Sequence, residues 1–141
     1  MRIAVIDGQG GGIGTSIIRK IKDVFAEAIE VWALGTNAIA TAQMMKAGAN
    51  KGATGENAIR HCVGQVDVVA APISVLVTHS MMGEVTPAIA NAVGSCSAVK
   101  LLLPLTQDPV TVIGTVREPL PHLVDKLIQH LTDLLTAQET P

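Results

Sequence analysis

The residues best suited to bind a ligand lie at the start of the chain, in a glycine-rich stretch after a short apolar run. Residues 3–6 show no polar alternation and stop at turn residues, which is typical of a buried strand. Five glycines then fall within seven residues, and a segment with helical spacing follows. Glycine lets a ligand approach the backbone, and the free amides of a helix N-terminus attract anions. We therefore predict that a nucleotide phosphate binds this turn: Asp7, Gly8, Gln9, Gly10, Gly11, Gly12, Ile13 and Gly14.

The spacing of these glycines narrows the type of ligand. Gly8, Gly12 and Gly14 fit the pattern GxxxGxG, whereas Ile13 stands where GxGxxG requires its last glycine. The pattern resembles the phosphate turn of short-chain dehydrogenases, which implies NAD(P) or another nucleotide as cofactor. The resemblance stops at the turn, because those enzymes need a Tyr-x-x-x-Lys pair and the chain has no tyrosine. A purely structural tight turn and a small anionic ligand are the alternatives.

Thr36 and Asn37 follow the second apolar run, at the place where dinucleotide-binding proteins contact the ribose. An acidic residue there is typical of NAD binding and an arginine of NADP binding, and neither is present. Thr36 and Asn37 can hydrogen-bond a ribose or a base, whereas Asn37 can equally cap the next helix. The sequence therefore leaves the choice of dinucleotide open.

Two further polar stretches supply candidate ligand residues. They form a possible second ligand loop or simply glycine turns with capped helices: Asn50, Thr54, Gly55, Glu56, Asn57, Ser80 and Glu84. Glu84 is the best placed carboxylate for general base work, with His79 or Asp7 as alternatives, although a solvated loop carboxylate has the same sequence signature. No cysteine or histidine pair has metal-ligand spacing, so we predict no metal site.

Composition restricts the class of protein. The 141 residues are sufficient for a single domain spanning 1–141, whose core must be aliphatic because Phe25 and Trp32 are the only aromatic residues. A net charge of −2 and the scarcity of aromatic residues disfavour nucleic-acid binding. No apolar run reaches the roughly 20 residues of a membrane helix, and an immediate N-terminal strand leaves no room for a signal peptide. We therefore expect a cytoplasmic protein, which the two cysteines suit if they stay reduced.

Strand-like and helical segments alternate along the chain, which predicts a three-layer, Rossmann-like α/β domain with a mostly parallel sheet. The expected strands are residues 2–6, 29–34, 66–71, 98–103 and 111–114, and the expected helices are 13–26, 38–47, 56–63, 87–93 and 119–137. Residues 48–55 are expected to form a loop, and 73–77 fit either a strand or a helical turn. Right-handed crossovers favour the strand order 3-2-1-4-5.

Several joined motifs carry a resemblance that covers most of the chain. These are VIDGQGGGIG at 5–14, GTNA at 35–38, KAGANKGATGENA at 46–58 and GEVTPA at 83–88. Residues 2–114 thereby resemble a bacterial domain family of unknown function. That resemblance brings no activity, because the family is uncharacterised.

A fainter similarity links the chain to the nucleotide domain of tubulin-like cell-division GTPases. AGAN at 47–50 and VVAA at 68–71 are similar to a loop and a strand end of those proteins. Their GGGTGTG signature would fall within residues 72–83, where this chain lacks the glycines. The similarity implies nucleotide binding, and neither GTPase activity nor polymerisation.

Three functions are consistent with these observations. The first is a nucleotide-binding protein with a sensor or accessory role, whose site a homo-oligomer or partner completes. The second is a small lyase, isomerase or hydrolase that acts on an anionic substrate. The third is a structural or interaction subunit whose glycines serve only tight packing.

Overall fold

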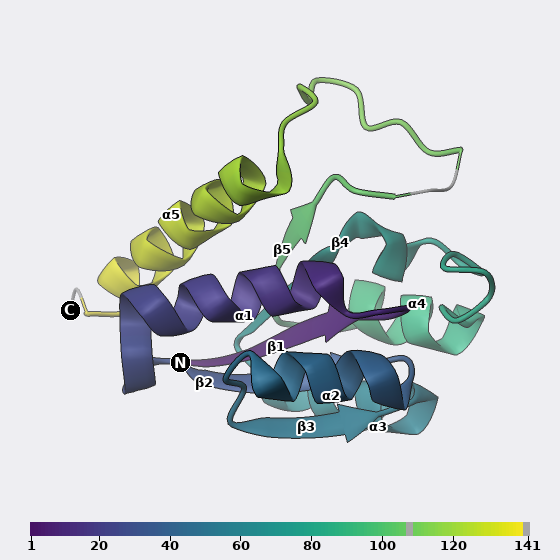
Figure 1. Cartoon of the computed structure of the whole chain (residues 1–141), viewed down its shortest axis with the longest axis horizontal. Coiled ribbons are helices and arrows are strands. Elements are labelled where there is room, and N and C mark those ends of the chain that lie inside the picture. The colour runs from purple at the N-terminus through teal and green to yellow at the C-terminus, as the bar shows by residue number, and fades with distance from the viewer. Residues whose placement is uncertain (107–108, 140–141) are drawn as a thin grey trace.

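The computed structural model describes residues 1–106 and 109–139, and its centre is one sheet of five parallel strands (Figure 1). The order β3-β2-β1-β4-β5 confirms the predicted topology. Each strand pairs only in the parallel sense, which continuous aliphatic runs favour. The strands are β1 (Arg2–Asp7), β2 (Glu30–Gly35), β3 (Lys51–Thr54), β4 (Val68–Pro72) and β5 (Val99–Leu103).

Helices cover both faces of the sheet, so the predicted three-layer α/β fold is also confirmed. Alternate residues of β1 point to opposite faces: Ile3 and Val5 pack with α1 (Gly12–Phe25), α2 (Ala38–Lys46) and α5 (Leu120–Glu139). Ala4 and Ile6 pack with α3 (Glu56–Cys62) and α4 (Pro87–Ser95). Short 3₁₀ turns, η1 (Ala26–Ala28), η2 (Val63–Gln65) and η3 (Ile73–Leu76), complete the elements.

Two of the predicted segments were assigned wrongly. Residues 51–54, expected in a loop, form the edge strand β3, so the strand expected at 66–71 is the fourth and lies on the other side of β1. The segment 111–114, expected as the fifth strand, is neither helix nor strand. It belongs to the connection between β5 and α5, where Pro104 and Pro109 lack the N–H groups that a ladder needs.

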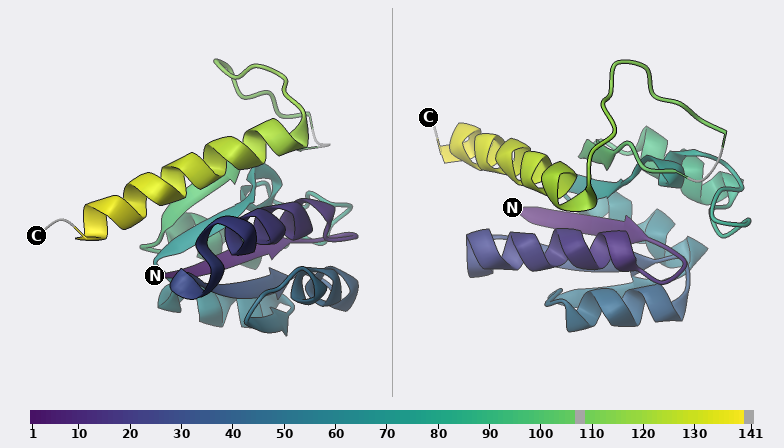
Figure 2. Two further views of the ribbon diagram at one scale, coloured as in Figure 1. Left: turned by 60° about the vertical axis from the view of Figure 1, so that its left-hand side comes forward. Right: turned by 45° about the horizontal axis from the view of Figure 1, so that its top comes forward.

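The described part of that connection stands away from the sheet, whereas α5 returns to lie along α1 (Figure 2). Leu123, Leu127 and Leu131 of α5 are buried against the α1 side of the core. The apolar stripe of the C-terminal helix therefore packs within its own domain. The sequence allows either a strand or a helical turn at residues 73–77. In the structure this segment contains η3, a 3₁₀ turn directly after β4.

Candidate functional site

The carboxyl ends of β1 and β4 bound a small cleft at the point where the strand order reverses. β1 has β2 on one side and β4 on the other, so the strand order reverses beside β1. In open α/β sheets, ligands usually bind at such a reversal. The cleft has a volume of about 260 Å³. Its lining combines polar and apolar side chains: Asp7, Gln9, Ile13, Ser74, Met81, Leu105 and Thr106.

Asp7 closes the glycine turn from inside. Its Oδ1 accepts from the amide of Gly8 and its Oδ2 from that of Gly14, both at 2.8 Å, and only 3% of the residue is exposed. Burial raises the pKa of Asp7 above its ordinary value, and the hydrogen bonds from Gly14 and Gly8 offset part of that rise. Two amides of the predicted phosphate turn thus hold a carboxylate of the protein itself.

Glu84 occupies three further donors, one in the glycine turn and two in the residues after β2. Its Oε1 accepts from the Gln9 amide at 2.9 Å, from Thr36 Oγ1 at 2.6 Å and from Asn37 Nδ2 at 2.8 Å. Burial raises the pKa of Glu84, but these three hydrogen bonds outweigh burial and hold the pKa below its ordinary value. Glu84 is therefore an anion held by the glycine turn together with Thr36 and Asn37, and it is a weaker base than a free glutamate.

The contribution of Glu84 to stability should depend on pH in a defined direction. Because its folded pKa lies below the ordinary value of 4.5, the stabilisation is present above that pH and is lost as pH falls through the folded pKa. Urea unfolding of wild type and Glu84→Gln should give a constant difference in unfolding free energy from about pH 6 to 8. That difference should shrink in acid, and a difference that grows in acid would contradict the assignment.

The glycines of the turn fall into two groups. A Cβ on Gly8 would approach Thr36 Oγ1 to 2.4 Å, and one on Gly14 would approach Met44 Sδ to 2.4 Å, while Gly11 has φ +74° beside Ala40. Packing and backbone conformation therefore explain these three glycines. Gly10 and Gly12 are different, because a Cβ on either would meet nothing within 4 Å and neither has a positive φ.

Gly10 and Gly12 are also exposed, and within residues 1–106 and 109–139 their amides donate to no other group. Gly12 is the first residue of α1, where the helix dipole favours an anion. The fold thus gives no packing reason for glycine at these positions.

The second polar stretch lies partly at this edge of the sheet. Thr54 Oγ1 bonds Thr41 Oγ1 at 2.7 Å, Gly55 donates to the Gly35 carbonyl, Glu56 accepts from Thr86, and Asn57 is exposed on α3. Asn50 lies at the opposite edge, where its Oδ1 accepts from Lys22 Nζ and the Val31 amide. The structure therefore separates Asn50 from the other predicted ligand residues, and the described lining of the cleft includes neither Glu56 nor the rest of the stretch 54–57.

Residues 79–84 form a turn with unusual backbone angles. His79, Met81 and Met82 have φ values of 67°, 56° and 56°, which non-glycine residues adopt at a cost. Ser80 is fully buried and donates to the Ser74 carbonyl, so it anchors the turn and does not face solvent. His79 is exposed, and no contact joins it to the cleft within the described residues.

Four residues that line the cleft are not among the ligand residues predicted from the sequence: Ser74, Met81, Leu105 and Thr106. Ser74 lies in the segment whose conformation was open, and Leu105 and Thr106 follow β5. The signal for them was positional, because residues after the carboxyl ends of β4 and β5 face the same edge as the glycine turn.

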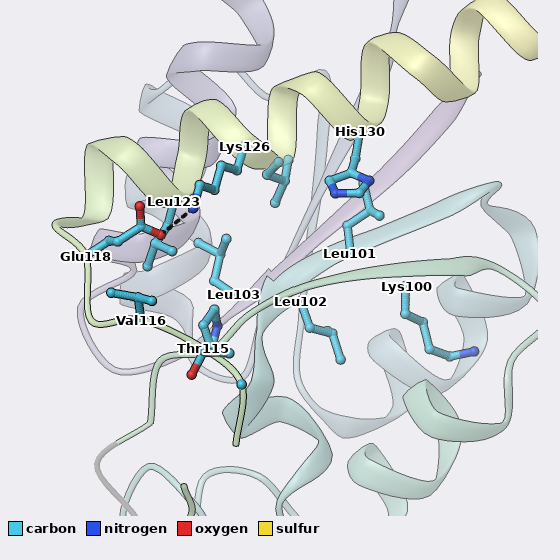
Figure 3. A pocket seen from close by; sticks show the side chains of 13 residues that line it. Lys100, Leu101, Leu102, Leu103, Thr115, Val116, Glu118, Leu123, Lys126 and His130 are labelled. Carbon is cyan, nitrogen blue, oxygen red and sulfur yellow. Dashed lines mark hydrogen bonds and ion pairs between the residues drawn. The ribbon is translucent and has the colours of Figure 1, made fainter. Parts of the chain in front are cut away.

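A larger cleft of about 420 Å³ lies beside the edge strand β5, between that strand, the connection to α5 and α5 itself (Figure 3). Leu101, Leu103 and Leu123 give it an apolar wall. Its two lysines are engaged: Lys126 Nζ bonds Glu118 at 2.7 Å, and Lys100 Nζ donates to backbone carbonyls. The smaller cleft remains the better candidate, because it adjoins the glycine turn.

Two negative findings concern the described part of the chain. Among its residues, no group of three histidine, cysteine or acidic side chains is arranged to hold a metal ion. None of the described helices is both long and apolar enough to cross a membrane.

Comparison with known proteins gives one fold relative and one family. A dodecameric FMN-dependent UbiX-like decarboxylase from Escherichia coli O157:H7 has a similar fold, with a TM-score of 0.50 and 11% identity over 94% of each chain. At that identity the likeness concerns the fold alone. A search of curated proteins found no match. The model of a domain of unknown function, DUF3842, matches residues 2–136, and the chain therefore belongs to this family.

Proposed function

We propose that this protein binds a nucleotide at the carboxyl edge of its sheet, with a phosphate against the amides of Gly10 and Gly12. The observation that carries the proposal is that these two exposed glycines have neither a packing nor a conformational reason to be glycine. Gly12 is the first residue of α1 and Gly10 directly precedes the N-cap Gly11, so both lie near a helix N-terminus, where the dipole favours an anion. The neighbouring cleft would take the part of the nucleotide beyond its phosphate.

The lining of the cleft indicates which part of a nucleotide fits there. Ile13, Met81 and Leu105 provide apolar surface for a ring, and Asp7 and Gln9 provide polar groups at its edge. Among the described residues the lining includes no lysine or arginine, and Asp7 repels a second anion. A neutral heteroaromatic ring in the cleft and a phosphate at the turn agree with this distribution of charge.

A flavin mononucleotide is one ligand of this class, and the structurally similar decarboxylase is described as FMN-dependent. The proposal places its phosphate against the amides of Gly10 and Gly12. At about 260 Å³ the cleft is smaller than the roughly 300–1,000 Å³ of pockets that enclose a whole ligand. The rest of the nucleotide would extend over the surface of one chain.

We include self-association in the proposal, because a second copy would cover the exposed part of the ligand. The similar decarboxylase is described as dodecameric. In this chain Ile113 and Val116, on the connection before α5, are 89% and 75% exposed and offer apolar surface. Sedimentation velocity of the purified protein tests this part of the proposal.

A sensor or accessory role agrees better with the site than general base catalysis by Glu84. The three hydrogen bonds to Oε1 hold the pKa of Glu84 below its ordinary value, which weakens it as a base. His79 also makes no contact with the cleft within the described residues. The proposal therefore assigns binding to the site and no reaction.

A thermal-shift screen against NAD, NADP, FAD, FMN, ATP, GTP and inorganic phosphate tests the proposal. A ligand at 100 times its dissociation constant should add about 2.7 kcal/mol to the stability of wild type. Gly12→Val should abolish that shift, because the new side chain stands where the phosphate approaches the amide. The ligand-free melting temperature should change little, since a Cβ at residue 12 meets nothing within 4 Å.

Gly64→Val is the matched control, because Gly64 in η2 also has open space around a Cβ but precedes β4, at the opposite edge of the sheet. It should retain the full ligand shift. Absence of a shift with every compound would exclude nucleotide binding, and an undiminished shift in Gly12→Val would exclude the Gly12 amide as the phosphate site.

A further inference from the structure

We propose that Glu84 is a built-in competitor of the ligand, whose carboxylate fills an anion subsite that an incoming phosphate or carboxylate must take over. The subsite consists of the Gln9 amide, Thr36 Oγ1 and Asn37 Nδ2, all of which now donate to Glu84 Oε1. The subsite includes the amide of Gln9, the residue directly before Gly10, and so it adjoins the phosphate position of the proposed function. This inference rests on that proposed function and adds to it a regulation of ligand binding there.

The donor set is the kind that recognises an oxyanion. A backbone amide, a hydroxyl and a side-chain amide converge on one oxygen at 2.6–2.9 Å, from the turn after β1 and the residues after β2. These are the two loops that contact the phosphate and ribose of a nucleotide in open α/β sheets. Charge-assisted bonds of this type favour any oxygen that carries negative charge.

The subsite stays formed when Glu84 leaves, because other bonds hold its donors. The Thr36 amide donates to the Asp7 carbonyl at 3.0 Å. Asn37 Oδ1 accepts from the Ala40 amide at 2.9 Å as the N-cap of α2, and Asn37 Nδ2 also donates to the Gln9 carbonyl. A ligand anion would therefore meet donors that are already in place, which lowers the cost of binding.

Glu84 can leave by rotation of its side chain alone. The backbone around it is fixed, since Ser80 and Val85 are fully buried, the His79 amide donates to the Val85 carbonyl and the Glu84 amide donates to the Met81 carbonyl. The Glu84 side chain is only half-buried, so its carboxylate can reach water without movement of the turn. Displacement thus exchanges one anion for another at an unchanged site.

Competition should appear as weakened binding in wild type. If Glu84 occupies the subsite nine-tenths of the time or more, removing its charge should tighten binding about tenfold or more. Isothermal titration of wild type, Glu84→Gln and Glu84→Ala with inorganic phosphate, and with the nucleotides of the thermal-shift screen, measures this effect. Glu84→Gln keeps the size of the side chain, so the measurement does not depend on whether the smaller Ala variant folds.

Glu56→Gln is the matched control, because Glu56 is a nearby exposed carboxylate whose Oε1 accepts from Thr86 and not from the turn. It removes the same charge and should leave affinity unchanged. Tighter binding in both glutamate variants would overturn displacement in favour of general repulsion. If wild type binds the ligand and Glu84→Gln binds it no more tightly, the inference is overturned and the proposed function stands. If neither wild type nor any variant binds a ligand, both are overturned.

Discussion

Replacing Gly35 with alanine is expected to lower the free energy of unfolding by about 2–3 kcal/mol, because the site has no room for a methyl group. A Cβ on Gly35 would lie 2.2 Å from Thr41 Oγ1, 2.7 Å from the Asn37 carbonyl oxygen and 2.7 Å from the Thr41 amide nitrogen. Two of these atoms are backbone, so the clash cannot be relieved by turning a side chain. Urea unfolding of the variant measures the loss.

The same substitution should also disturb the residues after β2. Gly35 is the last residue of β2, and the start of α2, capped by Asn37, must shift to accept the methyl group. Gly64→Ala is the control, since a Cβ there meets nothing within 4 Å and the backbone φ is not positive. It should change stability by less than about 1 kcal/mol, in the stabilising direction. Equal losses in the two variants would contradict the packing explanation for Gly35.

The sequence predicted the buried strands well, because burial on both faces leaves a direct mark on composition. β1, β2 and β4 are largely apolar runs of buried residues that end at glycine, proline or polar residues. The edge strand β5 is also largely apolar, although only Leu103 is buried. β3 has the sequence Lys-Gly-Ala-Thr and is mostly exposed, so it lacks the apolar signal of the other strands. Its place depends on backbone pairing with β2 and on Gly52, where a Cβ would meet Met45 Sδ at 2.8 Å.

The segment 111–114 shows the opposite case, a strand-like composition without strand pairing. Thr-Val-Ile-Gly has the composition of a strand, but Ile113 is 89% exposed and no described strand pairs with it. Strand propensity measures how well side chains fit a half-buried pleated surface. Here the fold provides no such surface, so composition alone gave the wrong assignment.

The sequence indicates which candidate ligand residues lie together, but not the hydrogen bonds between them. The sequence predicts ligand residues in the glycine turn and at Thr36, Asn37 and Glu84. The structure brings these residues together at the carboxyl edge of the sheet. Sequence could not show that Glu84 bonds Gln9, because 75 residues separate them and the contact depends on left-handed residues such as Met81 and Met82. Nor could it show that Asp7 accepts from the amides of the turn that it precedes.

Asp7→Ala is the second variant for which we expect a large loss, of about 2–3 kcal/mol in unfolding free energy. The substitution removes both acceptors and leaves the amides of Gly8 and Gly14 buried without partners, each at a cost of about 1–3 kcal/mol. Burial of the charged carboxylate is itself unfavourable and raises the pKa of Asp7. The substitution removes this unfavourable burial, which offsets part of the loss of stability. Asp125→Ala is the control, because the Asp125 side chain is 62% exposed and pairs only loosely with Lys20, at 3.7 Å.

Asp7→Asn separates the two effects that the alanine variant combines. The amide side chain keeps one acceptor oxygen for Gly8 or Gly14, but its NH₂ group faces the other backbone donor. If the hydrogen bonds dominate, urea unfolding should place Asp7→Asn between wild type and Asp7→Ala. A variant as stable as wild type would show instead that the cost of burying the charge equals the value of the second hydrogen bond. In that case the carboxylate would bring the turn no net stability over an amide, and the reason for Asp7 would have to be sought in the proposed ligand.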